Sequence, residues 1–189
     1  MSTISTSDFR KGIKIEIDGK PYLMELCEFV KPGKGQGIYR TKLRNLLDNS
    51  LLERTYRSGD SAEAADVHES KGSFLYKDQQ NYVFMDSNSY EQYPLTAEAV
   101  GEGADFLLEG TECGLLYWNN RLIGVSIPKH MVLKVTYTEQ AARGNTATNV
   151  TKPATLETGA SVTVPPFINA GDKIKVDTRT GEYLERVRE

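Results

Sequence analysis

The sequence has little that could hold a metal or a covalent cross-link, since it contains only two cysteines and two histidines. Cys27 and Cys113 lie far apart, which favours free thiols in a reducing cytoplasm over a disulfide framework. His68 and His130 are also distant from each other, and no spacing of Cys and His resembles a zinc site. We therefore predict neither a metal site nor a disulfide-dependent fold.

Long apolar runs are missing as well. No stretch approaches the roughly 18 apolar residues that a membrane-spanning helix needs. Residues 1–7 lack the basic segment followed by an apolar segment that marks a secretory signal. We therefore expect a soluble, cytoplasmic protein that has no membrane partner.

Signatures of catalysis are poor. The sequence has no Gly-x-Ser-x-Gly elbow and no Walker loop, and Gly101-Glu102-Gly103 lacks the strand–turn–helix context of a dinucleotide fingerprint. Residues 66–69 contain two acids and a histidine, a pattern more typical of a polar linker than of metal ligands. We predict no catalytic residues and no bound cofactor, so the sequence favours a protein that acts by binding over an enzyme.

Charge is distributed unevenly along the chain. The net charge of −3 divides into +2 for residues 1–64, −7 for residues 65–128 and +2 for residues 129–189. This partition predicts three domains with those boundaries. It excludes a uniformly basic surface for nucleic acid, but it allows a local basic footprint.

Strand patterns dominate the first of these domains. Ile13, Ile15 and Ile17 alternate with polar residues, and Asp18-Gly19 is a strong two-residue hairpin signal. Strands are predicted at 12–17, 22–30, 38–47 and 51–57. A small curled sheet of this kind is typical of an SH3-like barrel.

The other two domains also have short strand-like runs. We expect strands at 72–76, 81–85, 90–94, 114–118, 122–127, 131–138, 160–164, 173–177 and 183–187. Residues 95–106 are the one helical candidate, with Thr96 as N-cap, and residues 140–158 are expected to form a loop. The fold class is therefore all-β, and many short strands with one short helix favour an OB-type barrel.

The segment Lys31-Pro32-Gly33-Lys34-Gly35-Gln36-Gly37 joins two predicted strands, and we call it the tip loop. Three glycines at alternate positions allow its backbone unusual conformations or close approach to a partner. No apolar side chain lies within it. Lys34 between two glycines could carry a positive charge into a narrow place, and the alternative is a solvated loop with an ordinary surface lysine.

The strand after the tip loop is free of acids. Between Glu28 and Asp48 there is no acidic residue, and alternation places Arg40, Lys42 and Arg44 on one face of the strand. Three cations in a row repel each other unless something anionic lies across them. The alternatives are a solvated outer face or a phosphate backbone that runs along the hairpin, and we favour the phosphate backbone.

Three segments of the sequence form a recognisable set: Lys31-Pro32-Gly33-Lys34-Gly35, Lys42-Leu43-Arg44-Asn45, and a long pattern from Gly159 to Tyr183 that includes Val164-Pro165 and Gly171-Asp172. With them, the sequence resembles the bacterial translation elongation factor P family over essentially its whole length. The resemblance implies an N-terminal SH3-like (KOW-type) barrel followed by two OB-fold barrels. It also implies an L-shaped arrangement that mimics tRNA.

The resemblance also implies a function. Members of this family bind both subunits of the ribosome beside the peptidyl-tRNA and relieve stalling at consecutive prolines. Lys34 aligns with the residue that approaches the CCA end of that tRNA. Many relatives extend this lysine covalently, for example by β-lysylation, so a Lys34-modifying enzyme is an expected partner. Arg40, Lys42 and Arg44 would then face the acceptor arm, and we expect a monomer.

Two positions depart from the family pattern. The third-domain loop, placed near the small subunit and the mRNA, has Gly144-Asn145-Thr146 where many relatives have Gly-Asp-Thr. An amide there keeps one donor and one acceptor but loses the charge. Gly37 stands where Ala or Ser is usual, which is expected to make the tip loop more flexible.

Two other classes of protein compete with an elongation factor. A general single-stranded nucleic-acid-binding OB protein needs exposed aromatics on a basic face. The second domain has four candidate aromatics but a charge of −7, which argues against that class. An enzyme that uses Lys34 as a nucleophile needs a pocket to bury it, and the tip loop has no apolar residue to build one.

Overall fold

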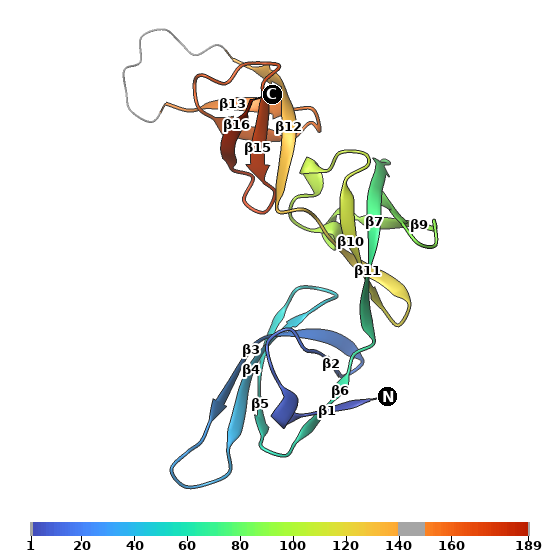
Figure 1. Ribbon diagram of the computed structural model, residues 1–189, viewed down its shortest axis with the longest axis vertical. Helices are drawn as coiled ribbons and strands as arrows, with labels where there is room; N and C mark the ends of the chain where they lie inside the picture. The colour runs from blue at the N-terminus through green and yellow to red at the C-terminus, as the bar shows by residue number, and fades with distance from the viewer. Residues whose placement is uncertain (1, 140–149, 189) are drawn as a thin grey trace. The chain divides into compact units, whose positions relative to one another are not determined.

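The computed structural model describes residues 2–139 and 150–188, and the fold is all-β as the sequence predicts. The strands form three antiparallel sheets that follow one another along the chain (Figure 1). The chain divides into two compact units, Met1–Ser70 with Leu115–Gly124 and Lys71–Gly114 with Val125–Glu189. The domain boundaries near residues 64 and 129 stay a prediction.

The first sheet has the strand order β1-β6-β2-β3-β4-β5. Its strands are β1 (Thr3–Ser5), β2 (Lys14–Ile17), β3 (Lys20–Val30), β4 (Ile38–Asn45), β5 (Leu51–Arg57) and β6 (Ser61–Ala64). Asp18 (φ 51°) and Gly19 (φ 71°) form the left-handed turn that the hairpin signal predicts. Two short strands, the edge strand β1 and its neighbour β6, were not predicted from the sequence.

The core of this sheet is small and tightly closed. Ile15, Met24 and Leu43 are fully buried, and they pack with Phe9, Ile17 and Tyr56. The inward side chains of β2 and β4 occupy alternate positions, which is why a period of two in the sequence is enough to find these strands. The hairpin of β3 and β4 extends from this core and carries the tip loop at its end (Figure 1).

The second sheet has the order β11-β10-β7-β8-β9. Its strands are β7 (Val67–Lys77), β8 (Asn81–Asp86), β9 (Gln92–Thr96), β10 (Glu112–Trp118) and β11 (Arg121–Ser126). Phe74, Phe84 and Leu115 are buried between its strands. The sheet therefore uses most of its large apolar side chains as core.

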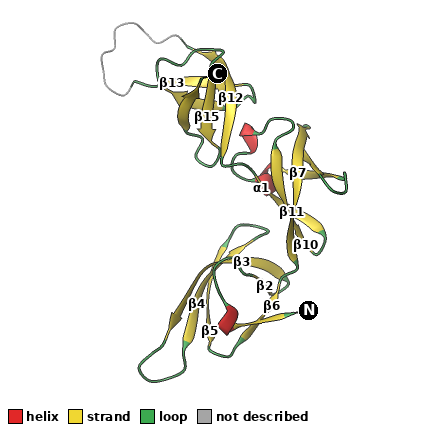
Figure 2. Ribbon diagram, in the orientation of Figure 1, coloured by secondary structure: helices red, strands yellow, loops and turns green. Residues whose placement is uncertain are grey.

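The predicted helix at residues 95–106 is wrong over most of its length. Within residues 95–106 the structure has one turn of α-helix, α1 (Ala97–Val100), and a separate 3₁₀ turn at Ala104–Phe106 (Figure 2). Thr96 is the N-cap as predicted, since its hydroxyl accepts a hydrogen bond of 3.3 Å from the Ala99 amide. Gly101 (φ 79°) and Gly103 (φ 87°) end the helix, because neither conformation continues an α-helix.

The third sheet has the order β14-β13-β12-β15-β16. Its strands are β12 (His130–Thr138), β13 (Lys152–Leu156), β14 (Ser161–Val164), β15 (Lys173–Asp177) and β16 (Tyr183–Val187). Residues 152–156 were expected to lie in a loop, so that expectation is wrong for them. Pairing with a strand on each side outweighs the weak strand propensity of a Lys-Pro-Ala-Thr sequence.

A side chain from outside the third sheet completes its core. Phe106, from the 3₁₀ turn, packs with Leu133, Val135 and Ile174. The segment before this turn lies close to the last hairpin of the sheet. A Cβ on Gly103 would lie only 2.9 Å from the Thr178 carbonyl oxygen, which shows how near the two backbones are. The third sheet thus depends on an aromatic ring that its own strands do not supply.

This dependence can be tested by removing the ring. Phe106→Ala should lower the local stability of the third sheet by about 3 kcal/mol, because it leaves a cavity in a closed core. Hydrogen exchange of the Leu133 and Ile174 amides measures that local stability. Tyr137→Ala, which removes a ring that is 63% exposed, is the matched control and should change it by less than about 0.5 kcal/mol. Equal effects of the two variants would show that Phe106 is not part of this core.

Candidate functional site

The tip loop, residues 31–37, connects β3 to β4 and is exposed up to Gln36. Lys34 lies at its end and, within the described part of the chain, forms no hydrogen bond or ion pair. Gly35 beside it adopts φ 122°, a conformation that favours glycine. The Lys34 ammonium group is therefore available to a partner from outside the protein.

The C-terminal arm of the loop is fastened to the turn between β5 and β6. The Gln36 side-chain amide donates a hydrogen bond to the Ser58 carbonyl oxygen, and the Ser58 amide donates one of 2.8 Å to the Gly37 carbonyl oxygen. Sequence analysis missed this attachment, because Ser58 is distant in the chain and carries no distinguishing signal. The tip loop is thus not a freely solvated segment.

Aromatic rings connect this arm to the core of the first sheet. Phe29 lies 4.9 Å from Tyr39 between ring centroids, Tyr39 lies 6.3 Å from Phe9, and Phe9 lies 5.1 Å from Tyr56. Phe9 and Tyr56 are buried, whereas Phe29 is 54% exposed. Because these rings pack against one another, they restrict bending of the β3–β4 hairpin and connect its end to the core of the sheet.

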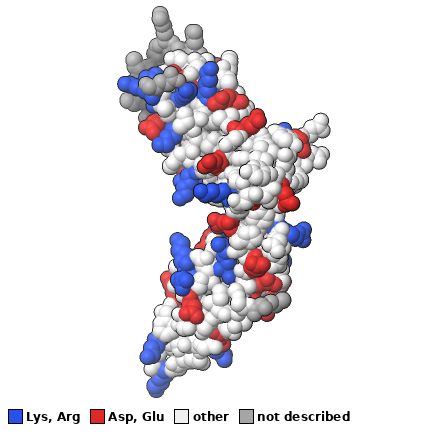
Figure 3. All heavy atoms as spheres, turned by 45° about the vertical axis from the view of Figure 1, so that its right-hand side comes forward, with Lys and Arg blue, Asp and Glu red and all other residues white. Residues whose placement is uncertain are grey.

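The structure places Arg40, Lys42 and Arg44 on the outer face of β4, while Thr41 and Leu43 point into the core. Figure 3 shows Lys and Arg side chains at the lower end of this unit, where the tip loop lies. On the flank above, both signs of charge are mixed. Acids also border the outer face of β4, since Glu28 and Glu53 line the groove beside Arg40 and Lys42.

Arg44 already has an internal anion. Its guanidinium donates to both carboxylate oxygens of Glu25 at 2.5 and 3.3 Å, and to the Asn49 carbonyl oxygen at 3.1 Å. The hydrogen bond from Arg44 lowers the pKa of Glu25; burial opposes this, while the charges of Arg44, Lys42 and Lys11 reinforce it. Glu25 lies at a bulge in β3, and an acid-free stretch in β4 could not indicate an acid on the neighbouring strand.

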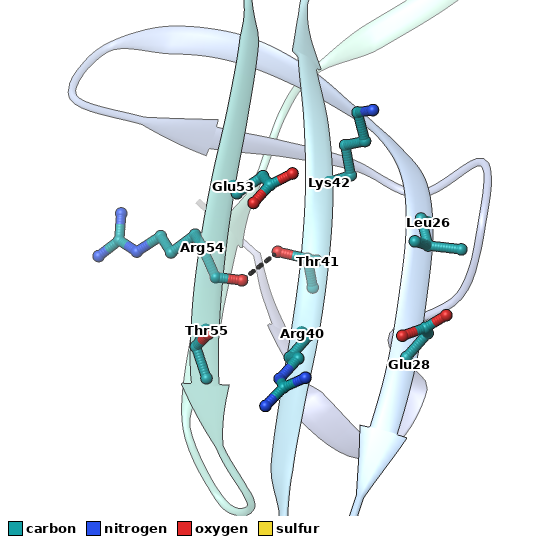
Figure 4. Close-up of a pocket in the computed structure, with 8 residues that line it drawn as sticks. All are labelled: Leu26, Glu28, Arg40, Thr41, Lys42, Glu53, Arg54 and Thr55. Atoms are coloured by element: carbon teal, nitrogen blue, oxygen red, sulfur yellow. Dashed lines mark hydrogen bonds between the residues drawn. The ribbon is translucent and has the colours of Figure 1, made fainter.

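The other two cations border an open groove of about 370 Å³ on the β3–β4–β5 surface (Figure 4). Arg40 lies opposite Glu28, and Lys42 lies between Leu26 and Glu53. Neither cation is within ion-pair distance of an acid among the described residues. Arg40 and Lys42 are therefore the cations of this face that can still pair with an external anion.

Other chemistry is not supported by the described residues. They contain no cluster of His, Cys, Asp and Glu that could hold a metal. Burial raises the pKa of the Cys113 thiol to about 11 and also raises that of Cys27, so neither is an activated nucleophile. Within the same ranges no helix is long and apolar enough to cross a membrane. Gly144, Asn145 and Thr146 lie outside the described residues.

The three parts of the chain match three family models. The models described as "Elongation factor P (EF-P) KOW-like domain", "Elongation factor P (EF-P) OB domain" and "Elongation factor P, C-terminal" match residues 5–62, 67–125 and 131–186. The chain is 49% identical over 187 residues to an elongation factor P of Rhodopirellula baltica, covering 99% of this chain and 96% of that protein. It is 49% identical over 184 residues to an elongation factor P of Syntrophus aciditrophicus, covering 97% and 98%.

Solved structures add a fold-level likeness. The chain is similar to a eukaryotic translation initiation factor 5A from Methanococcus jannaschii with a TM-score of 0.54 and 22% identity, covering 67% of this chain and 92% of that one. An identity this low shows the fold alone. With the three matched models, it confirms the predicted order of a KOW-like N-terminal domain followed by OB domains.

The ion pair between Arg44 and Glu25 gives a testable pH dependence. Since the folded state lowers the pKa of Glu25, the pair stabilises the first sheet above the carboxyl's ordinary pKa. This contribution is lost as the pH falls through the lowered value. In an NMR titration of the Glu25 carboxyl, Arg44→Gln should return the midpoint toward its ordinary value, whereas Arg40→Gln should leave it in place. Equal shifts in the two variants would contradict the pairing.

Proposed function

Because the chain belongs to the elongation factor P family, we propose that it binds the ribosome beside the peptidyl-tRNA and promotes peptide-bond formation at consecutive prolines. Family membership establishes the broader role of a translation elongation factor. The single observation that supports the finer proposal is the position of Lys34. It lies exposed at the end of a hairpin that packs on the core of the first sheet, and it has no partner among the residues that the structure describes.

The proposed action is to position the donor, not to catalyse bond formation chemically. Proline is a poor acceptor because its secondary amine and fixed φ restrict the geometry of attack. A factor that holds the CCA end of the donor tRNA lowers the orientation cost of a step that the ribosome itself catalyses. A cation on a long, flexible side chain suits this task, because it can reach the phosphate groups at the end of an RNA chain.

A covalent extension of Lys34 fits the same argument. An unmodified lysine loses side-chain entropy of about 2 kcal/mol when it docks. That cost offsets much of one charge-assisted hydrogen bond, which contributes about 1.5–3 kcal/mol. A longer side chain with additional donors, such as one produced by β-lysylation, would shift the balance toward an ordered contact. We therefore propose a Lys34-modifying enzyme as a partner.

The basic outer face is proposed to meet the acceptor arm of the tRNA. Arg40 and Lys42 are the cations that remain for phosphate, while Arg44 holds Glu25 and orders the strand. Glu28 and Glu53 flank the same groove, so phosphate groups fit only where the two cations stand. This arrangement favours a limited set of contacts at a fixed register over non-specific attraction to nucleic acid.

A general single-stranded nucleic-acid-binding protein is the alternative function. That class stacks bases on exposed aromatic rings. The four candidate aromatics of the second domain are Tyr82, Phe84, Tyr90 and Tyr93. Tyr82 is 3% exposed and Phe84 is fully buried, so their rings belong to the core. Tyr90 is exposed, but the nearest charged residues on either side of it in the sequence, Asp86 and Glu91, are both acidic. These observations favour the elongation factor over the strand binder.

Removing the Lys34 side chain tests the proposed function. Lys34→Ala should leave the fold intact and reduce ribosome affinity only modestly, because other surfaces still bind. Reconstituted translation through three consecutive prolines should slow by at least about tenfold, while a proline-poor template should be unaffected. Both proteins should come from a host able to modify Lys34. Full rescue of the polyproline template by Lys34→Ala would refute the proposal.

The phosphate contacts predict a change in salt dependence. Replacing Arg40 and Lys42 together with Gln should weaken ribosome binding and reduce the slope of log affinity against log salt by about 1–2. Lys20→Gln is the control, since Lys20 is an exposed cation at the start of β3 and does not line this groove. Binding that does not change at any salt concentration would mean that the outer face of β4 is only solvated.

A further inference from the structure

We infer that Phe29 is a positioning residue, whose ring closes over Gly37 and thereby fixes the direction in which Lys34 is presented. This inference rests on the proposed function of Lys34. It concerns a contact that no sequence pattern indicates. Gly37 was expected to make the tip loop more flexible, but its missing side chain is what makes this contact possible.

The geometry at Gly37 shows that the need for glycine is steric. Gly37 is not among the residues with positive φ, so an L-amino acid could adopt its backbone conformation. A Cβ at this position would, however, lie 2.6 Å from both Cε2 and Cζ of Phe29. Such an approach is closer than carbon atoms tolerate, so either the ring or the loop would have to move. The ring thus occupies the space that a larger residue would need.

The Phe29 ring is itself held in place from the other side. Phe29 pairs with Tyr39 across β3 and β4, and the two rings meet at an angle of 49°. Tyr39 contacts the buried ring of Phe9. A Phe29 ring that moved to make room at position 37 would therefore change its packing against Tyr39. Its 54% exposure shows that core burial alone does not account for its position.

The two arms of the tip loop differ in how far they are fixed. Gly37 is held by the Phe29 ring and by the Ser58 amide, and Gln36 is bonded to Ser58 as well. A Cβ on Gly33, in the other arm, would meet nothing within 4 Å. Lys34 thus stands between an open arm and a fixed arm. The fixed arm removes part of the conformational freedom that Lys34 would otherwise lose on docking.

The experiment combines a dynamic readout with a functional one. Phe29→Ala should lower the ¹⁵N order parameter of the Gly35 amide and slow polyproline translation by about tenfold or more. Gly37→Ala, which places a methyl group against the Phe29 ring, should lower the same order parameter. The double variant should be no worse than Phe29→Ala, because the ring that the new methyl group would meet is gone. Phe29→Tyr keeps the ring and should retain both order and rescue.

Two controls separate this contact from general damage to the loop. Gly33→Ala adds the same methyl group to the open arm and should leave the Tyr39 and Phe29 ring resonances unchanged. Leu47→Ala removes an apolar side chain that is 45% exposed in the turn after β4, away from the tip loop, and it should leave polyproline translation unchanged. Intact amide spectra of β2 and β3 in each variant show that the sheet has folded.

The inference is overturned if Gly37→Ala behaves like Gly33→Ala in the order parameters, or if the double variant shows the sum of the two single effects. Lys34→Ala in the same translation assay distinguishes this failure from a failure of the proposed function. If Lys34→Ala still rescues, the proposed function falls. If Lys34→Ala fails to rescue while Phe29→Ala rescues fully, Lys34 acts without the Phe29 contact.

Discussion

The structure of the candidate site depends on the attachment of one arm of the tip loop to the first sheet. The Phe29 ring covers Gly37, and the Ser58 backbone holds both Gly37 and Gln36. Without these contacts a loop that contains three glycines would sample many conformations, and a lysine at its end would have no defined direction. With these contacts, the loop that carries Lys34 is attached to the first sheet, although Lys34 itself lies outside the core of that sheet.

The charges on the outer face of β4 are also arranged by contacts with neighbouring strands. Three cations in a row would repel each other, and the sheet relieves this by placing Glu25 against Arg44 at a bulge in β3. That leaves Arg40 and Lys42 beside an open groove whose acids lie beyond ion-pair distance. One cation therefore stabilises the strand, and two can bind an external anion. This division separates folding from binding on a single face.

The sequence predicts much of the fold for a simple physical reason. Strands β2 and β4 alternate buried side chains with more exposed ones, and that period can be found without knowing any partner strand. The prediction of a helix at 95–106 was wrong because Gly101 and Gly103 adopt positive φ. The prediction of a loop at 152–156 was wrong because pairing with a strand on each side determines β13. Both errors arise where tertiary context outweighs local propensity.

The candidate site could be predicted only in part, for the same reason. Lys34 between two glycines and the alternation of Arg40 with Lys42 can be found in one strand and one loop. The partners that give these residues their roles come from elsewhere: Glu25 from β3, Ser58 from a turn two strands later, and Phe29 from across the hairpin. Contacts between segments distant in sequence leave no periodic signal in a single chain.

The most direct test of this account is a structure of the protein bound to a ribosome stalled at consecutive prolines. The account predicts that Lys34 lies against the CCA end of the peptidyl-tRNA, with Phe29 still packed on Gly37. It also predicts that Arg40 and Lys42 face acceptor-arm phosphates while Arg44 keeps its contact with Glu25. A tip loop that points away from the peptidyl-tRNA, with the outer face of β4 in solvent, would contradict it.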